Sequence, residues 1–246
     1  MRSKAFHAFE QKLIYFEDDL ELVDVLRTSI LNGELTDAGS SSVLKNVDGM
    51  KHSHIGRRKN SDGSRELIIN HLRTTLYSAY VKDLYEELTE YLRTILEQAS
   101  ENGIDAGRVI GEHSFKIDAK TVLEAGNWNN ITKLVADSIF QSLESEKSTL
   151  KLIEKISNKL ALGVNKAHIE DVLPYLEVRH FLVHTDGKVS ASFKKSYPHI
   201  KLNARGKVIL GFDFVKELKT KVTVLLSEFD KKVIDNRVID VAYTQP

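Results

Sequence analysis

The stretch LIINHLRTTLYSAYVKDLYEELTEYLRTILEQA, residues 67–99, decides the fold class. Apolar side chains recur at every fourth position: Ile68, Leu72, Leu76, Tyr80, Leu84, Leu88, Leu92 and Leu96. A step of four drifts around a helix that has about 3.6 residues per turn, and further apolar residues widen the stripe. These are Ile69, Val81, Tyr85 and Ile95. The pattern predicts a long helix that packs on more than one partner and ends near Asn102-Gly103.

Helical spacing of three and four also predicts helices over residues 5–31, 131–160 and 212–235. Residues 168–184, HIEDVLPYLEVRHFLVH, indicate a short helix that runs into a second one. Pro174 suits the first turn of the second piece, because a missing N–H costs nothing there.

The remaining segments lack a helical period. Residues 33–65 are rich in Gly, Ser, Asn and Asp, which predicts a flexible polar loop. We expect residues 103–130 to be irregular, with HSFKID (113–118) extended and Trp128 in a packing role. Polar and apolar residues alternate in KVSASF (188–193), which is typical of an extended segment. HIKLNARGKVIL (199–210) predicts a β-hairpin around Asn203-Ala204-Arg205-Gly206. We therefore predict an all-α helical bundle with a small β-hairpin near residues 199–210, in a single domain over residues 1–246.

Composition narrows the functional classes. The 246 residues include 35 Lys plus Arg and 35 Asp plus Glu, so any site for a polyanion has to be local. There is no cysteine, which excludes disulfides, thiolate metal sites and cysteine nucleophiles. The N-terminal residues have no signal-peptide core, and no apolar stretch is long enough for a membrane span, so we expect a cytoplasmic protein without a membrane partner.

The end of the polar loop is locally basic. Five cations face a single Asp62 there: Lys51, Arg57, Arg58, Lys59 and Arg65. A flexible basic segment can hold phosphates, so this segment is a candidate RNA contact. The alternative is a solvated mobile loop without a ligand.

Side chains that together could catalyse a reaction lie close in sequence only in EVRHFLVHTDGKV, residues 177–189. His180 and His184 are four apart and share a helix face, whereas Arg179 and His184 are separated by roughly 140° around the axis. Histidine titrates near neutrality and can move the proton of a ribose 2′-hydroxyl. Arginine is always charged and can stabilise the charge that develops on phosphate. This combination suits RNA cleavage without a metal, and Gly187 is expected to end the helix.

Arg179 and His184, placed before a Thr-Asp-Gly turn on a late helix of an all-α chain, resemble the R-x4-6-H motif of the HEPN superfamily (higher eukaryotes and prokaryotes nucleotide-binding domain). As a motif the resemblance covers residues 177–193. It implies a metal-independent endoribonuclease of a bacterial toxin or anti-phage defence type, in which the motifs of a homodimer face each other across a cleft. It places Arg179 and His184 at the catalytic positions and His180 where the family commonly has a polar residue.

The resemblance also bears on partners. RNA is the implied substrate, and an antitoxin or another defence-system protein is a candidate partner. Asp186 stands where toxins silenced by a nucleotidyltransferase have tyrosine, so that kind of antitoxin is not inferred. With no Gly-rich phosphate loop, no G-x-S-x-G motif and no dinucleotide fingerprint in the sequence, we expect no cofactor.

Other interpretations stay open at this point. Arg179 and His184 can be purely structural, and the whole chain can be a non-catalytic HEPN-like dimeric module that binds RNA, nucleotide or protein. His180 and His184 can also bind zinc, if one more ligand joins them. The candidates for that ligand are His168, His199 and Glu177. Tyr175 and Tyr197 can stack on bases or serve as packing residues.

Overall fold

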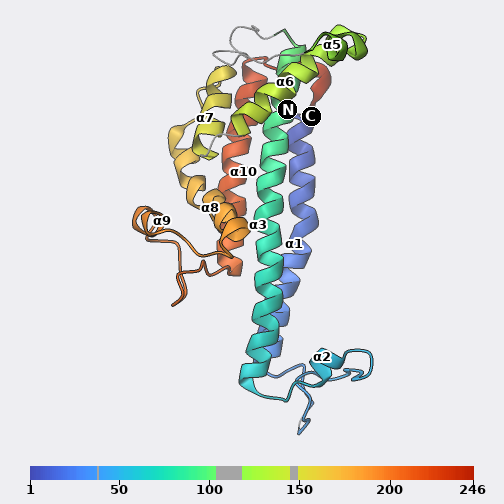
Figure 1. The fold of residues 1–246 in the computed structure, drawn as a ribbon, viewed down its shortest axis with the longest axis vertical. Coiled ribbons are helices and arrows are strands. Elements are labelled where there is room, and N and C mark those ends of the chain that lie inside the picture. Colours follow the sequence, from blue (N-terminus) through green and yellow to red (C-terminus); the bar gives the residue numbers. More distant parts are fainter. Residues whose placement is uncertain (38, 104–117, 145–148) are drawn as a thin grey trace.

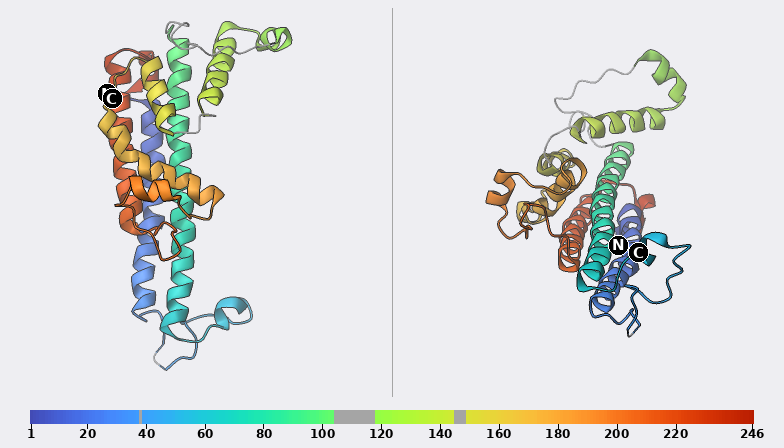
Figure 2. Two further views of the ribbon diagram at one scale, coloured as in Figure 1. Left: turned by 60° about the vertical axis from the view of Figure 1, so that its left-hand side comes forward. Right: turned by 60° about the horizontal axis from the view of Figure 1, so that its bottom comes forward.

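The computed structural model describes residues 1–37, 39–103, 118–144 and 149–246, and its architecture is all-α, as predicted (Figures 1 and 2). In chain order the elements are β1 (Arg2–Ser3), α1 (Lys4–Leu31), α2 (Ser53–Gly56), α3 (Asp62–Glu101), α5 (Ala119–Ala125), α6 (Trp128–Glu144), α7 (Thr149–Lys159), α8 (Lys166–His184), α9 (Ala191–Ser196), α10 (Phe212–Asp235), the 3₁₀ helix η1 (Val241–Tyr243) and β2 (Thr244–Gln245). None of the helices in the described ranges is both long and apolar enough to cross a membrane.

Helix α3 is the spine of the molecule (Figure 1). Its 40 residues extend for about 60 Å, and α1 packs along it in the opposite direction. Near its start α3 contacts α1 alone among the long helices, and Leu72 is 40% exposed. Further along, α3 also meets α6, α8 and α10, and Leu84 and Leu92 are buried. The apolar stripe is therefore partly exposed near the start of α3, although Ile69 is buried there, and it is largely buried where several helices surround α3.

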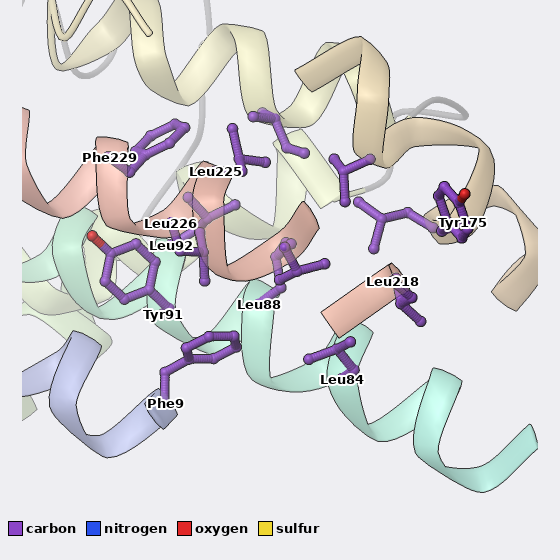
Figure 3. Packing of buried hydrophobic residues seen from close by; sticks show 14 of the residues in the cluster. Phe9, Leu84, Leu88, Tyr91, Leu92, Tyr175, Leu218, Leu225, Leu226 and Phe229 are labelled. Atoms are coloured by element: carbon purple, nitrogen blue, oxygen red, sulfur yellow. The ribbon is translucent and has the colours of Figure 1, made fainter. Parts of the chain in front are cut away.

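The core lies where α1, α3, α8 and α10 converge (Figure 3). Leu88 and Leu92 of α3 face Leu225 and Phe229 of α10, and all four are almost completely buried. Phe9 of α1 closes this core from one side and Tyr175 of α8 lies at its other end. Helix α8 is thus held by the same core as the two long helices.

A buried carboxylate joins the two ends of the chain to this core. Asp230 of α10 is 2% exposed and accepts hydrogen bonds from the backbone N–H of Ser3 (2.9 Å) and from its hydroxyl. The hydroxyl of Tyr91 donates to the same carboxylate over 3.2 Å. Ser3 also caps α1 by accepting from the N–H of Phe6. The antiparallel pair β1–β2 then brings the C-terminus beside the N-terminus.

Several predicted boundaries are confirmed and others are corrected. Helices α1 and α10 lie where their periodicity placed them. The predicted helix over 131–160 is two helices, α6 on α3 and α7 on α8. The residues from Glu144 to Ser148 are all polar, so no apolar stripe continues across them. Helix α3 begins at Asp62, so Arg65 is helical and not part of the loop.

The prediction of two pieces in residues 168–184 is wrong, because α8 is continuous from Lys166 to His184. Pro174 lies inside it, and Leu173, Pro174 and Tyr175 are all buried. Packing of this face offsets the backbone hydrogen bond that proline cannot donate.

Smaller errors concern the irregular segments. Residues 119–125 form α5, and Trp128 is 75% exposed at the start of α6, so it is not a packing residue. HSFKID (113–118) lies outside the described residues except for Asp118, which caps α5.

The two short segments after α8 differ in outcome. KVSASF is not extended throughout, because Ser190 caps α9 and turns the chain into a helix. The expected hairpin near 199–210 forms through an antiparallel bridge between Leu202 and Val208 and a tight turn before Gly206.

Glu97 of α3 and Asp137 of α6 form a carboxyl pair at the contact between these helices. Burial of Glu97, and then its hydrogen bond with Asp137, raise the pKa of Glu97 to about 7. Lys133 lies 3.9 Å from the same carboxyl and opposes the rise. Between pH 4.5 and about 7 the folded chain therefore keeps a proton that the unfolded chain has lost, and stability falls as the pH rises.

Glu97→Gln removes this ionisation. We expect the variant to gain melting temperature relative to wild type at pH 8 and to match it near pH 4.5, as measured by circular dichroism. Glu86→Gln, at an exposed position of the same helix, is the control and should give no such pH-dependent difference. A difference between Glu97→Gln and wild type that stays constant from pH 4.5 to 8 would contradict the shared proton.

Candidate functional site

The final turns of α8 carry the three predicted site residues, Arg179, His180 and His184. Arg179 faces α3, and its guanidinium carbon lies 4.8 Å from the ring centroid of Tyr85. Its Nε is buried and has no hydrogen-bond acceptor among the described residues. A cation on an aromatic face is stabilised by the quadrupole of the ring and keeps its charge. Arg179 is thus a cation positioned by Tyr85, and its Nε is buried without an acceptor in the described part of the chain.

His180 and His184 form the second part of the site. Their ring centroids are 4.5 Å apart, as expected for positions i and i+4, and both residues are exposed. The edge of the His180 ring also meets Phe181, with 5.8 Å between the centroids. The structure therefore confirms that the two imidazoles share a face, at the solvent-facing end of the helix.

The helix ends directly after His184. The N–H groups of Thr185 (3.0 Å) and Gly187 (2.8 Å) both donate to the carbonyl of Phe181. Asp186 and Gly187 have φ angles of 52° and 79°, so two consecutive residues are left-handed. The left-handed conformation predicted for Gly187 is confirmed, but the C-cap is Thr185 and Asp186 is the first left-handed residue. The hydroxyl of Thr185 closes the turn by donating to the Phe181 and Lys188 carbonyls.

The hairpin holds this turn from the other side. The N–H of Val208 donates to the carbonyl of Gly187 (3.0 Å), and the N–H of Val189 donates to that of Gly206 (3.1 Å). Asp186 pairs with Lys207, which lowers the pKa of the Asp186 carboxyl. The position of His184 is therefore set by long-range backbone bonds as well as by its own helix.

Arg179 and His184 are not brought together within one chain. Arg179 lies against Tyr85 on the α3 side of α8, whereas His184 lies against His180 and is exposed. This agrees with the roughly 140° that separates their positions around the helix axis. One chain consequently presents the cation and the imidazole pair on different sides of α8.

The candidate zinc ligands are dispersed. His168 is bound to Glu228 (2.6 Å) and lies twelve residues, or about 18 Å, before His180 on α8. His199 lies against the rings of Tyr175 and Tyr197. Glu177 is half-buried, and this burial raises the pKa of its carboxyl. In the described ranges, no three His, Asp or Glu residues gather in a metal-binding cluster.

The two tyrosines near the motif pack within the protein. Tyr175 is 3% exposed and its ring centroid lies 5.2 Å from that of Phe214, so it cannot stack on a base. Burial, followed by a hydrogen bond with Glu217, raises its pKa. Tyr197 is half-buried with its ring 5.0 Å from Phe193.

The predicted RNA-contact segment lies at the end of the molecule where α3 begins, whereas α9 lies beside the middle of the long helices (Figure 1). Arg65 is twenty residues before Tyr85 on α3, so the segment starts about 30 Å from Arg179. Arg65 bonds to Asn60 (2.5 Å) and Asp62, and Arg57 bonds to the Ser53 carbonyl. The other three cations of the segment are exposed: Lys51, Arg58 and Lys59. Its role in binding RNA stays a prediction.

Comparisons with protein-family models, with curated proteins and with solved structures gave no match. The chemistry of this site therefore has to be judged from its own residues. The sequence did not indicate that Tyr85 supports Arg179. Tyr85 was identified only as one of the residues that widen the α3 stripe, and no local pattern connects it to α8.

We expect the contact between Arg179 and Tyr85 to be measurable as a coupling energy. Tyr85→Phe keeps the aromatic face and should leave the free energy of unfolding nearly unchanged. Tyr85→Leu removes the face and should cost about 0.5–1 kcal/mol more than Tyr85→Phe. That difference should disappear when Arg179→Met is also present, because a double-mutant cycle isolates the pairwise contribution. An unchanged difference in that background would show that Arg179 does not rest on the ring.

Gly187→Ala tests the turn that positions His184. An alanine at φ 79° is strained, and its Cβ would lie 3.5 Å from Leu182 Cδ2. We expect a loss of about 1 kcal/mol in the free energy of unfolding, measured by urea titration. Gly63→Ala in the first turns of α3 has open space and should be neutral or stabilising. Equal effects of the two substitutions would contradict the left-handed turn.

Proposed function

We propose that this chain is a metal-independent endoribonuclease of HEPN type, acting as a homodimer in the cytoplasm as a toxin or anti-phage defence effector. The observation that carries the proposal is the pairing of a positioned cation with exposed imidazoles on consecutive turns of α8. The guanidinium of Arg179 is held on the ring of Tyr85, and His180 and His184 lie at the solvent-facing helix end. These are the groups that phosphodiester cleavage by a 2′-hydroxyl requires.

The proposed reaction proceeds without an added oxidant or metal. His184 accepts the proton of a ribose 2′-hydroxyl, and the 2′-oxygen attacks the adjacent phosphorus. The bond from phosphorus to the 5′-oxygen breaks, and a protonated imidazole returns a proton to that oxygen. Arg179 stabilises the charge on the phosphoryl oxygens, with His180 orienting its neighbour or the phosphate. The products are a 2′,3′-cyclic phosphate and a 5′-hydroxyl.

The placement of the groups supports the proposal of a dimer. Arg179 and His184 lie on different sides of one α8, so a single chain is poorly suited to place both on one phosphate. A two-fold axis that brings two α8 ends together would put the arginine of one subunit near the histidine of its partner. An antitoxin or another defence-system protein would then regulate access to the shared cleft.

A second candidate function is a non-catalytic dimeric module that binds RNA, nucleotide or a protein partner. It is favoured by the burial of Arg179 Nε, since a structural arginine can be retained for packing on Tyr85 alone. The neutral net charge of the chain also suits a binding module more than a typical nuclease.

Cleavage of total cellular RNA in the presence of EDTA tests the proposal. We expect wild type to cut RNA, and His184→Ala and Arg179→Ala to lose roughly 10²–10⁴-fold in rate while remaining folded by circular dichroism. His71→Ala, an exposed histidine of α3 outside both basic segments, is the matched control and should cut like wild type. New termini should be 5′-hydroxyls.

The other outcomes separate the alternatives. Cutting that EDTA abolishes would contradict a metal-free mechanism. Absence of cutting by pure, folded wild type, together with RNA binding, would favour the non-catalytic module.

A further inference from the structure

The segment between α8 and α10 has a charge unlike that of the whole chain. Residues 186–210, which we name the basic lobe, contain six Lys and Arg residues and one acidic residue, Asp186, a net of +5 against zero for the chain. The six cations are Lys188, Lys194, Lys195, Lys201, Arg205 and Lys207. A local field of this kind attracts polyanions even when the net charge of the protein is zero.

Most of this charge is uncompensated. Lys207 pairs with Asp186, but the other five side chains are exposed and have no ion-pair partner within the described ranges. Elsewhere the chain pairs many of its cations, as in Lys12 with Glu87 and Lys232 with Glu228. The lobe therefore keeps its positive charge available for a ligand.

The lobe is also well anchored. Phe193 and Ile200 are buried in the main core, and Phe193 lies 4.9 Å from Phe181 of α8, ring centroid to ring centroid. At the hairpin tip, Asn203 Oδ1 accepts from the N–H groups of Arg205 (2.9 Å) and Lys207 (3.0 Å). Cations on such a scaffold lose less conformational freedom on binding than cations on a mobile loop.

A hollow of about 500 Å³ lies between α9 and the hairpin. Lys194 and Lys201 line it together with apolar Pro198, Ile200 and Leu202. An apolar wall beside cations suits a nucleotide whose base is unstacked and whose phosphate lies at the rim. Bases of a duplex are paired and cannot enter such a hollow.

The lobe adjoins the end of α8. It begins two residues after His184, and the hairpin bonds directly to Gly187 and Val189 in the turn. A strand lying on the lobe would therefore pass close to the exposed imidazoles. The polar loop, by contrast, joins α3 near Arg65, about 30 Å along the helix from the Tyr85 that contacts Arg179.

We infer that the basic lobe binds the phosphates of single-stranded RNA and delivers the strand to the end of α8. The delivery step rests on the proposed function, because delivery to the end of α8 matters only if RNA is cleaved there. The binding itself is independent of cleavage.

The test uses a fluorescein-labelled 2′-O-methyl RNA twelve-mer, which lacks the attacking hydroxyl and cannot be cleaved by this route. Its affinity is measured by fluorescence anisotropy between 50 and 200 mM salt. The lobe variant is Lys194→Gln/Lys201→Gln/Arg205→Gln, and the matched control is Lys4→Gln/Lys231→Gln/Arg237→Gln, which removes three exposed charges that belong to neither basic segment. Both are checked for native melting temperature.

We expect the lobe variant to bind roughly tenfold or more weakly at low salt. The slope of log affinity against log salt should fall by about 2, since each lost contact to a single strand contributes about 0.7. The control variant should bind like wild type. Weakening by the control but not by the lobe variant would overturn the inference, as would binding only to phosphatidylserine vesicles or no binding by wild type.

The two proposals can fail separately. Binding that depends on the lobe, with no cleavage of unmodified RNA by wild type, would uphold the lobe and reject the nuclease. Cleavage that depends on His184, together with RNA binding that the lobe variant leaves unchanged, would uphold the nuclease and reject the lobe.

Discussion

The buried carboxylate of Asp230 is the constraint on which the arrangement of the long helices depends. It lies in the core and receives three hydrogen bonds, two from Ser3 and one from Tyr91. A buried charge left without partners typically costs about 3–5 kcal/mol, so α10 is stable in this position only when β1 and α3 occupy theirs. Because Ser3 also caps α1, one acceptor fixes the register of α1, α3 and α10 together. Apolar packing alone would tolerate small sliding of these helices.

The arrangement of the long helices determines the geometry of the candidate site. Helix α8 packs on α10 and α3, and burial of its face through Tyr175 and Val178 keeps it helical past Pro174. Arg179, immediately after this buried face, meets Tyr85 because α3 passes there. His180 follows Arg179 directly and His184 lies one turn after His180, where the helix leaves the core. The inward cation and the outward histidines are consequences of where the core ends.

The sequence predicted those features that have a local period or a strong terminator. Helix α10, helix α1 and the left-handed Gly187 were foreseen on that basis. Burial explains two results that the local sequence did not predict. It keeps α8 helical through Pro174, and its absence at Trp128 leaves that side chain exposed. The support of Arg179 by Tyr85 and the bonds to Asp230 join residues far apart in the chain. No spacing rule connects such residues, and strands of two residues are too short to show a period.

The distribution of charge adds a further constraint on any polyanion ligand. With 35 cations and 35 anions, long-range attraction depends on how the charges are segregated. At the polar loop, Arg65 is bonded to Asp62 and Asn60, so part of the positive charge predicted there is already neutralised or engaged. In the basic lobe only Lys207 is paired. A polyanion that approaches the basic lobe therefore meets five exposed cations, without ion-pair partners among the described residues, close to His184, and on the proposed function their field leads it toward the imidazoles.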